Sequence, residues 1–261
     1  MAAGRMTANS DPTKGHCSDF WNKLSIDRAL IEPNAGSYIY DDFTGFVAMV
    51  AAGNLFSAPW HGFFDAAAAA YALATGANGV LRLDPVATDN LRSVVTASGT
   101  GGMGTIAAGK EFAWEARVAV NNVALLHDAF VGVTAVGITA STALLFGATA
   151  GMTVVDYAGF RILEGDPDGW DAVHAKTGGA EVVVKEVAVN ATNGAFVNLG
   201  MRKKLNAPLE YFVNGAKVGE ALLTATNFPT AILTPTFGVV DRENVETDLD
   251  AEWVMAFSGR A

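Results

Sequence analysis

Cysteine and charge are both scarce in this chain. Cys17 is the only cysteine among 261 residues, which excludes an internal disulfide framework and a metal site built from several cysteines. Charged residues make up 17% of the sequence, against roughly 25% in ordinary globular domains. The fold must therefore depend on apolar packing. The low charge, with a mean hydropathy of +0.27, predicts surface hidden in a core or between subunits.

Positive charge is scarce as well. The formal net charge of −10 argues against a basic surface that would bind a phosphate backbone, so we expect no nucleic-acid partner. Residues 1–19 contain no apolar run and therefore no secretory signal, and we expect folding in the cytoplasm of the cell that makes the protein. Residues 129–155 are free of charge but rich in Gly, Thr and Val, which favours buried strands over a membrane-spanning helix.

A β-hairpin is the clearest structural signal. In residues 209–219, aromatic and β-branched residues alternate up to Asn214 and Gly215, the pair that supplies the two positive φ angles of a type I′ turn. Other short strand-like segments lie at 38–43, 79–84, 90–95, 111–120, 130–139, 157–163, 181–189, 196–201, 233–239 and 248–257. No helical period is sustained. The pattern predicts an all-β jelly-roll sandwich of antiparallel strands over residues 38–261.

The most regular segment, residues 111–120, predicts a half-buried strand. Its apolar positions share one face: Phe112, Trp114, Ala116, Val118 and Val120. The opposite face would place Glu111, Glu115 and Arg117 in solvent. The alanine-rich segment 63–73 fits a helix or a flat strand, and its place between two strand-like stretches slightly favours a strand.

Residues 1–37 form a polar N-terminal arm with one apolar patch. The patch, made of Phe20, Trp21, Leu24 and Ile26, fits a helical turn or a strand. Because these side chains are costly to leave in water, we expect the patch to dock on its own sandwich or on a neighbouring subunit. We predict that it contributes to assembly more than to folding.

The order of short motifs resembles one known group of jelly rolls. The chain carries Asp41-Asp42-Phe43, a strand at 79–83, Phe-Ala-Trp-Glu-Ala-Arg at 112–117, a segment at 130–133, the Tyr-Phe-Val-Asn-Gly hairpin, Leu-Thr-Pro at 233–235 and Asp-Leu-Asp at 248–250. This order is similar to that of concanavalin A-like (laminin-G/glucanase-type) jelly rolls of bacteriophage virion proteins. The resemblance implies a non-enzymatic virion structural protein, such as a capsid decoration or cement protein.

The resemblance also implies partners and a location. We expect a homo-oligomer, with a trimer favoured, bound to the major capsid protein or other virion proteins at the capsid surface, without cofactor, metal or membrane. The alternative is a lectin-like carbohydrate-binding module of a phage fibre or capsid surface that serves host attachment. A divergent glycan hydrolase is a third hypothesis.

The hydrolase hypothesis meets a missing carboxylate. Glucanases of this architecture carry Glu-x-Asp-x-Glu on one strand, because retaining hydrolysis needs two carboxyl groups about 5 Å apart. The nearest match is Glu111, Ala113 and Glu115, with alanine in the central position. We therefore predict no catalytic residue, and expect Glu111 and Glu115 to be solvated.

Other candidate sites have weaker signals. Residues 164–171 resemble half a calcium loop but fit a plain turn better. Paired zinc spacing is lacking among the four histidines, His16, His61, His127 and His174. The glycine-rich segment 99–104 lacks the Lys-Ser/Thr of a phosphate loop. Trp60, His61 and Trp170 are candidates for stacking on glycan rings, with core or subunit contact as the simpler interpretation.

Overall fold

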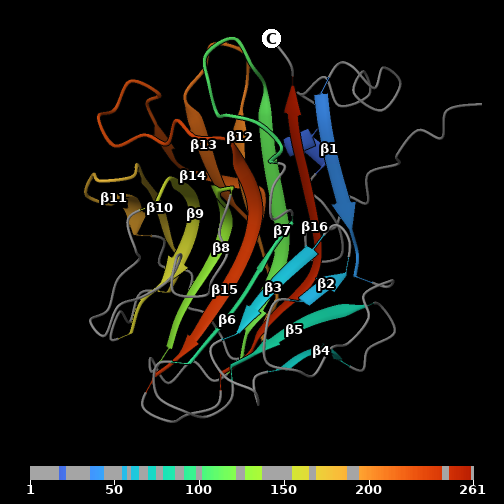
Figure 1. The fold of residues 1–261 in the computed structure, drawn as a ribbon. Helices are drawn as coiled ribbons and strands as arrows, with labels where there is room; N and C mark the ends of the chain where they lie inside the picture. Colours follow the sequence, from blue (N-terminus) through green and yellow to red (C-terminus); the bar gives the residue numbers. More distant parts are fainter. Residues whose placement is uncertain are drawn as a thin grey trace, which may run out of the picture.

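The computed structural model is a sandwich of two antiparallel β-sheets (Figure 1). It describes residues 18–21, 36–43, 55–57, 60–64, 70–74, 79–85, 91–97, 102–121, 127–136, 155–164, 169–186, 194–242 and 247–259. One short helix, α1 (Ser18–Trp21), belongs to the N-terminal arm.

Sixteen strands are described, eight in each sheet. Sheet A consists of β1 (Gly36–Asp41), β4 (Ala70–Ala74), β5 (Val80–Asp84), β7 (Phe112–Val120), β12 (Val197–Lys203), β13 (Leu209–Val213), β14 (Ala216–Ala221) and β16 (Leu249–Gly259). Sheet B consists of β2 (Leu55–Ser57), β3 (Trp60–Phe64), β6 (Arg92–Thr96), β8 (His127–Ala135), β9 (Tyr157–Ile162), β10 (Asp171–Ala175), β11 (Val182–Glu186) and β15 (Leu233–Asp241).

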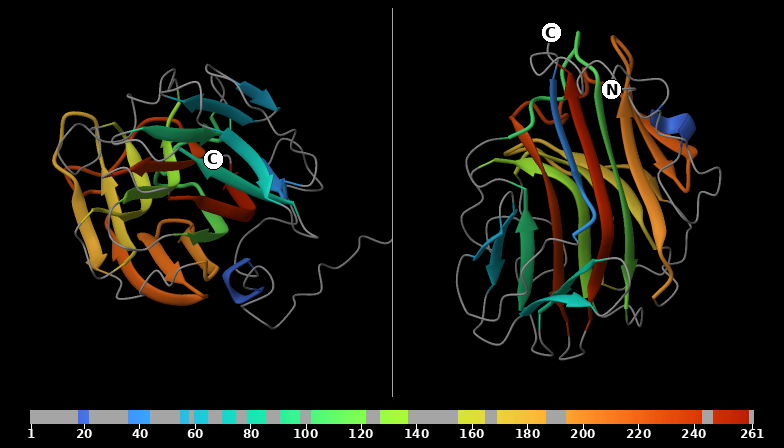
Figure 2. Two further views of the ribbon diagram at one scale, coloured as in Figure 1. Left: turned by 90° about the horizontal axis from the view of Figure 1, so that it is seen from below. Right: turned by 90° about the vertical axis from the view of Figure 1, so that its right-hand side faces the viewer.

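The strand order sends the chain back and forth between the sheets. Sheet A has the order β14-β13-β12-β7-β16-β5-β4, with β1 paired to β16, and sheet B has the order β11-β10-β9-β8-β15-β6-β3-β2. Consecutive strands β7 and β8 therefore lie in opposite sheets, as do β15 and β16. The side view in Figure 2 shows the two layers, with α1 on the side of sheet A that faces away from sheet B.

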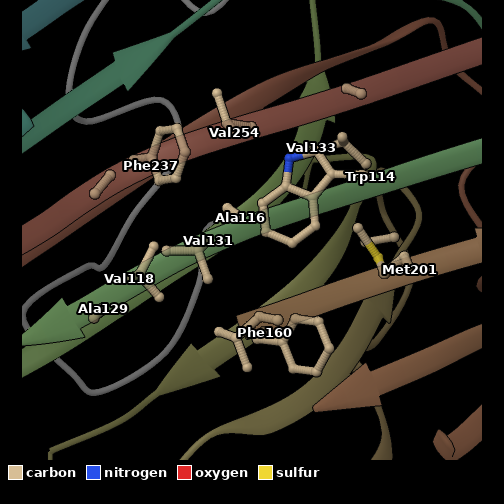
Figure 3. Close-up of a cluster of buried hydrophobic side chains, with 14 of the residues drawn as sticks. Trp114, Ala116, Val118, Ala129, Val131, Val133, Phe160, Met201, Phe237 and Val254 are labelled. Atoms are coloured by element: carbon tan, nitrogen blue, oxygen red, sulfur yellow. The ribbon is translucent and has the colours of Figure 1, made fainter. Parts of the chain in front are cut away.

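The hydrophobic core fills the space between the sheets (Figure 3). Trp114 of β7 and Phe160 of β9 are both fully buried there, together with Met201 of β12. Because side chains alternate along a strand, the same apolar set that defines the inner face of β7 points at sheet B. This packing explains how a chain with one cysteine holds two large sheets together.

The structure confirms the predicted all-β sandwich and its hairpin. Asn214 and Gly215 join β13 to β14 with φ angles of 48° and 78°, both positive, as a type I′ turn requires. The end of the alanine-rich segment is strand β4, whereas residues 65–69 lie outside the described part. Within the described residues, no helix combines the length and apolar character of a membrane span.

The prediction of a half-buried β7 is wrong, because both faces of this strand are covered. Glu115, expected in solvent, is 2% exposed. The apolar patch of the arm explains part of the difference, since α1 lies on the outer face of sheet A and forms a second buried cluster there with Phe212 and Trp253. Strands β2 and β10 were not expected from the sequence.

One histidine lies in the core without polar partners. His174 of β10 is 2% exposed, and neither ring nitrogen has a hydrogen-bond partner among the residues described. Its ring packs against Phe228 with 5.5 Å between centroids. Burial lowers the pKa of His174 from 6.5 to about 4, because the charged imidazolium loses its hydration.

We expect His174 to make the fold sensitive to acid. A group whose pKa is lower in the folded state takes up its proton first in the unfolded chain, so the free energy of unfolding falls as the pH drops from about 6.5 to about 4. His174→Phe keeps a ring beside Phe228 but has no group to protonate. The free energy of unfolding of this variant should therefore lack the decrease due to His174, which approaches about 1.4 kcal/mol per pH unit. Urea denaturation of both proteins across this window measures the difference, and parallel curves would contradict the assignment.

Candidate functional site

The outer face of sheet B carries an unusual concentration of charged and aromatic side chains. Figure 1 views the sandwich from the side of this sheet. In one cross-strand row, Gly238 of β15 pairs with Phe130 of β8, Phe130 with Arg161 of β9, and Arg161 with Asp171 of β10. Paired residues point to the same side of a sheet, so the row brings an aromatic ring, a cation and a carboxylate together.

Arg161 is the centre of this site. Its Nη2 lies 3.3 Å from Oδ2 of Asp171, and its Nε lies 3.0 Å from Oε1 of Glu181. The hydroxyl of Tyr157 donates to the other oxygen of Glu181. The side chains of Arg161 and Asp171 are 9% and 4% exposed, whereas that of Glu181 is 23% exposed. Glu181 is therefore the point at which this network reaches solvent.

Tyr157 joins the charged groups to an aromatic pair. Burial and the neighbouring Glu181 raise the pKa of Tyr157, so the hydroxyl stays protonated and acts as a donor. Its ring meets that of Phe130 edge to face at 5.7 Å. Gly132 and Gly159 leave room for the Phe130 ring, since a Cβ added at these positions would lie 3.0 Å and 2.9 Å from carbons of that ring. The glycines of β8 and β9 thus let an aromatic side chain lie over the sheet.

A second buried ion pair lies on the neighbouring part of the face. Arg242 donates to Oδ2 of Asp128 from Nε at 3.0 Å and from Nη2 at 2.5 Å. The other oxygen of Asp128 accepts the backbone N–H of Glu164 at 2.7 Å. Both side chains are nearly inaccessible, at 0% and 4%. This pair fixes the end of β15 to β8 and to the segment that follows β9.

Threonines fill the next rows toward β6. Thr236 Oγ1 lies 2.7 Å from Thr134 Oγ1 and 3.3 Å from Thr96 Oγ1. Thr234 Oγ1 is buried and has no hydrogen-bond partner among the residues that the structure describes. These hydroxyls add donors and acceptors to the same face.

Asp156 holds the segments around the site in place. Its carboxylate accepts backbone N–H groups of Thr177, Thr230 and Ala231 at 2.8, 2.6 and 2.8 Å. Burial alone would raise the pKa of Asp156, but these hydrogen bonds outweigh it and lower the pKa. The start of β9 is thereby tied to the turn after β10 and to the segment before β15.

The carboxylates of this face differ in their surroundings from the pair that a retaining glycosidase uses. Hydrolysis by retaining glycosidases needs one protonated carboxyl group beside a second carboxylate. Here Asp128, Asp171 and Glu181 are each paired with an arginine. Phe130, Tyr157 and the threonines of the face are buried, whereas Glu181 and His61 are partly exposed and accessible to a polar ligand.

For the two tryptophans among the candidate stacking residues, the structure confirms the simpler interpretation, which is a place in the core. Trp60 and Trp170 are each 1% exposed and belong to the main core, so neither indole offers a face to a sugar ring. The indole N–H of Trp60 donates to Asp41 at 2.7 Å. His61 is partly exposed and pairs with Thr96 on the outer face of sheet B, so its role in glycan contact stays a prediction.

Glu111 and Glu115, the two glutamates compared with the glucanase motif, have different surroundings. Glu111 is partly exposed, as expected. Glu115 is not solvated: its Oε2 accepts the indole N–H of Trp21 at 2.6 Å on the outer face of sheet A. Glu115 lies on β7 and Glu111 directly precedes it, so both belong to sheet A and not to the candidate face of sheet B.

The remaining candidate residues are placed only in part. Phe20 and Trp21 form part of α1 and are buried against the protein's own sandwich, whereas Leu24 and Ile26 lie outside the described residues. In the 164–171 segment, Trp170 is in the core and Asp171 pairs with Arg161, and residues 165–168 are not described. The described residues contain no group of three or more His, Cys, Asp or Glu side chains placed to hold a metal ion.

Sequence reasoning missed the residues that form this site. The available signal was Arg161, a lone charge in the otherwise apolar run Tyr-Ala-Gly-Phe-Arg-Ile, because a charge in a buried strand must have a partner. Its partners could not be identified that way. Asp171 begins a strand that was taken for a turn, and Glu181 lies ten residues further along.

Comparison with known proteins defines the fold class. No family model and no curated protein matches the sequence, but solved structures do. The carbohydrate recognition domain of Emp47p aligns over 88% of this chain and 99% of its own, with 10% identity and a TM-score of 0.55. A family 16 endo-glucanase from Bacteroides ovatus aligns over 84% and 99%, with 10% identity and a TM-score of 0.55. The Bacillus licheniformis β-glucanase aligns over 85% and 98%, with 14% identity and a TM-score of 0.51.

The chain therefore has the concanavalin A-like lectin/glucanase fold, an antiparallel sandwich found in a sugar-recognition domain and in glycoside hydrolases. The jelly-roll part of the sequence resemblance is confirmed. None of the similar structures named here is a phage protein, so the virion part of the resemblance stays a prediction.

We expect loss of Arg161 to destabilise the protein strongly. Arg161→Met leaves Asp171 and Glu181 without their cation, and breaking a buried ion pair in this way costs about 3–5 kcal/mol. Glu220→Gln is the control, since Glu220 and its partner Lys217 are 50% and 42% exposed and such pairs contribute at most about 1 kcal/mol. Chemical denaturation at pH 7 measures both. Equal losses in the two variants would contradict the buried-network assignment.

Proposed function

We propose that this protein is a non-catalytic carbohydrate-binding protein of the lectin type, and that its ligand contacts the outer face of sheet B around Glu181. The observation that carries the proposal is the Arg161 network on this face, within a fold that the carbohydrate recognition domain of Emp47p shares. Sugar hydroxyls are recognised by fixed charged and polar groups, with aromatic rings beside them.

Glu181 is the residue through which the ligand would reach the network. It is the more exposed partner of Arg161, and it is held by the hydroxyl of Tyr157 and the guanidinium of Arg161. Because these two contacts fix the orientation of the Glu181 carboxylate, less side-chain conformational entropy is lost when a ligand binds to it. His61, on β3 of the same sheet, would contact a ligand long enough to cross several strands.

Binding rather than hydrolysis is favoured by the surroundings of the acidic groups. Asp128, Asp171 and Glu181 have arginine partners. The nearest match to the glucanase motif, Glu111, Ala113 and Glu115, has alanine in its central position. The capsid-decoration role is the second candidate, carried by the motif order of the sequence. It is compatible with glycan binding, because a lectin-like domain on a particle surface would serve attachment.

We expect Glu181→Gln to weaken glycan binding about tenfold or more, because it replaces a charge-assisted acceptor by a neutral amide. The measurement is a glycan array followed by titration of a soluble hit, with mixed-linkage β-glucan included as a probe. Glu220→Gln, an exposed carboxylate on β14 of sheet A, is the matched control and should bind normally.

Two results would contradict the proposal. One is the absence of binding to every glycan on the array by folded protein. The other is release of reducing sugar from β-glucan that Glu181→Gln abolishes, which would make the protein a hydrolase.

A further inference from the structure

The N-terminal helix α1 packs on the outer face of sheet A. We call the surface beneath α1 the arm groove and define it by Glu115 of β7, Gly200 and Arg202 of β12, and Phe212 of β13. Gly200 pairs with Glu115 on one side and with Phe212 on the other, so these three residues lie in one row across three strands, and Arg202 lies two residues further along β12 on the same face. Figure 2 shows α1 against this face.

The groove recognises both the side chains and the backbone of α1. Phe20 lies over Gly200, where an added Cβ would come within 3.1 Å of its ring, and meets Phe212 edge to face at 5.1 Å. Arg202 donates from Nη1 to the backbone oxygen of Phe20 at 3.1 Å. Trp21 donates its indole N–H to Glu115 at 2.6 Å. Two charged groups and one aromatic ring of sheet A thus contact the Phe20-Trp21 pair.

An empty groove would be unfavourable. Glu115 and Arg202 are 2% and 5% exposed with α1 in place, and Trp21 supplies one of the hydrogen bonds that Glu115 needs in this buried position. Phe212, Trp253 and Met255 belong to the same buried cluster and would lose their cover. The protein is therefore more stable with a Phe-Trp segment in the groove than with the groove empty.

The chain that supplies this segment is not fixed by the contacts. Helix α1 has four residues, too few to be stable without the groove, and fourteen residues separate Trp21 from Gly36 at the start of β1. Fourteen residues reach at most about 50 Å when extended. The same contacts form whether α1 comes from its own chain or from a neighbour, and exchange of an identical element costs little free energy.

We propose that the arm groove is an assembly site, in which α1 of one copy binds the groove of a second copy. Exchange prevails where the local protein concentration exceeds the effective concentration of the tethered arm, on the order of millimolar. The partner is thus a second copy of this chain, and it contributes the Phe20 and Trp21 side chains that complete the site. This inference is independent of glycan binding.

The test uses two full-length variants that are each unable to fill their own groove. The arm variant, Phe20→Ser with Trp21→Ser, keeps an open groove. The groove variant, Gly200→Leu, keeps the arm but places a side chain where the Phe20 ring lies. Gly200 is an extended strand residue, so the substitution does not strain the backbone.

Each variant alone should have the mass of one chain by light scattering. An equimolar mixture should give a 1:1 complex of twice that mass, because the arm of the groove variant fills the groove of the arm variant. The control is each variant alone at the total protein concentration of the mixture, and it should stay at the mass of one chain. A mixture that stays at this mass, with both variants folded by circular dichroism, would overturn the proposal.

A second measurement decides the question if a variant does not fold. A fluorescent peptide of residues 15–26 is titrated into the unmodified full-length protein, where it competes with the resident arm. Saturable binding, weakened about tenfold or more by Trp21→Phe in the peptide because the indole donor is lost, supports the proposal. No saturable binding, or equal binding of the two peptides, would overturn it.

Discussion

The structure depends on one constraint, that a buried charge must have a partner of opposite charge within hydrogen-bonding reach. Arg161 on the outer face of sheet B and Arg202 on the outer face of sheet A are both buried, at 7% and 5% exposed. Arg161 draws Asp171 and Glu181 to the same point and thereby fixes β9, β10 and the start of β11. Arg202 binds Glu210 and the backbone of Phe20, and so ties the arm to the sandwich. Leaving either charge unpaired would cost several kcal/mol of stability. Substitutions at these positions are therefore tolerated less well than substitutions at their apolar neighbours.

The fold alone does not decide function. The same sandwich is found in a sugar-recognition domain and in family 16 hydrolases, so the distinction lies in the side chains on its surfaces. On sheet B, the carboxylates are held by arginines and by Tyr157 in fixed positions. Charged groups held in fixed positions are suited to recognition of a polar ligand, and they motivate the binding proposal. On sheet A, equivalent chemistry is directed at the protein's own Phe-Trp segment.

Sequence patterns predicted those features that depend on residues adjacent in the chain. The Asn214-Gly215 turn was predictable, because its two positive φ angles depend on two adjacent residues. The apolar side of β7 was predictable from alternation. The burial of Glu115 was not predictable, since the alternating sequence pattern is the same whether water or α1 covers the charged side chain. Trp60 and Trp170 lie in the core, as the simpler of the two sequence interpretations expected, but the sequence alone did not separate burial from an exposed stacking role.

By itself, then, the sequence determined the all-β class, the hairpin, the inner face of β7 and the absence of a disulfide framework, all of which follow from neighbouring residues or composition. Only the tertiary structure decided which charges meet. Arg161 and Glu181 are twenty residues apart, and Trp21 and Glu115 are ninety-four apart, so their contacts depend on sheet order and register. Those contacts form the candidate site and the arm groove, because the chemistry of a surface arises from residues that folding brings together.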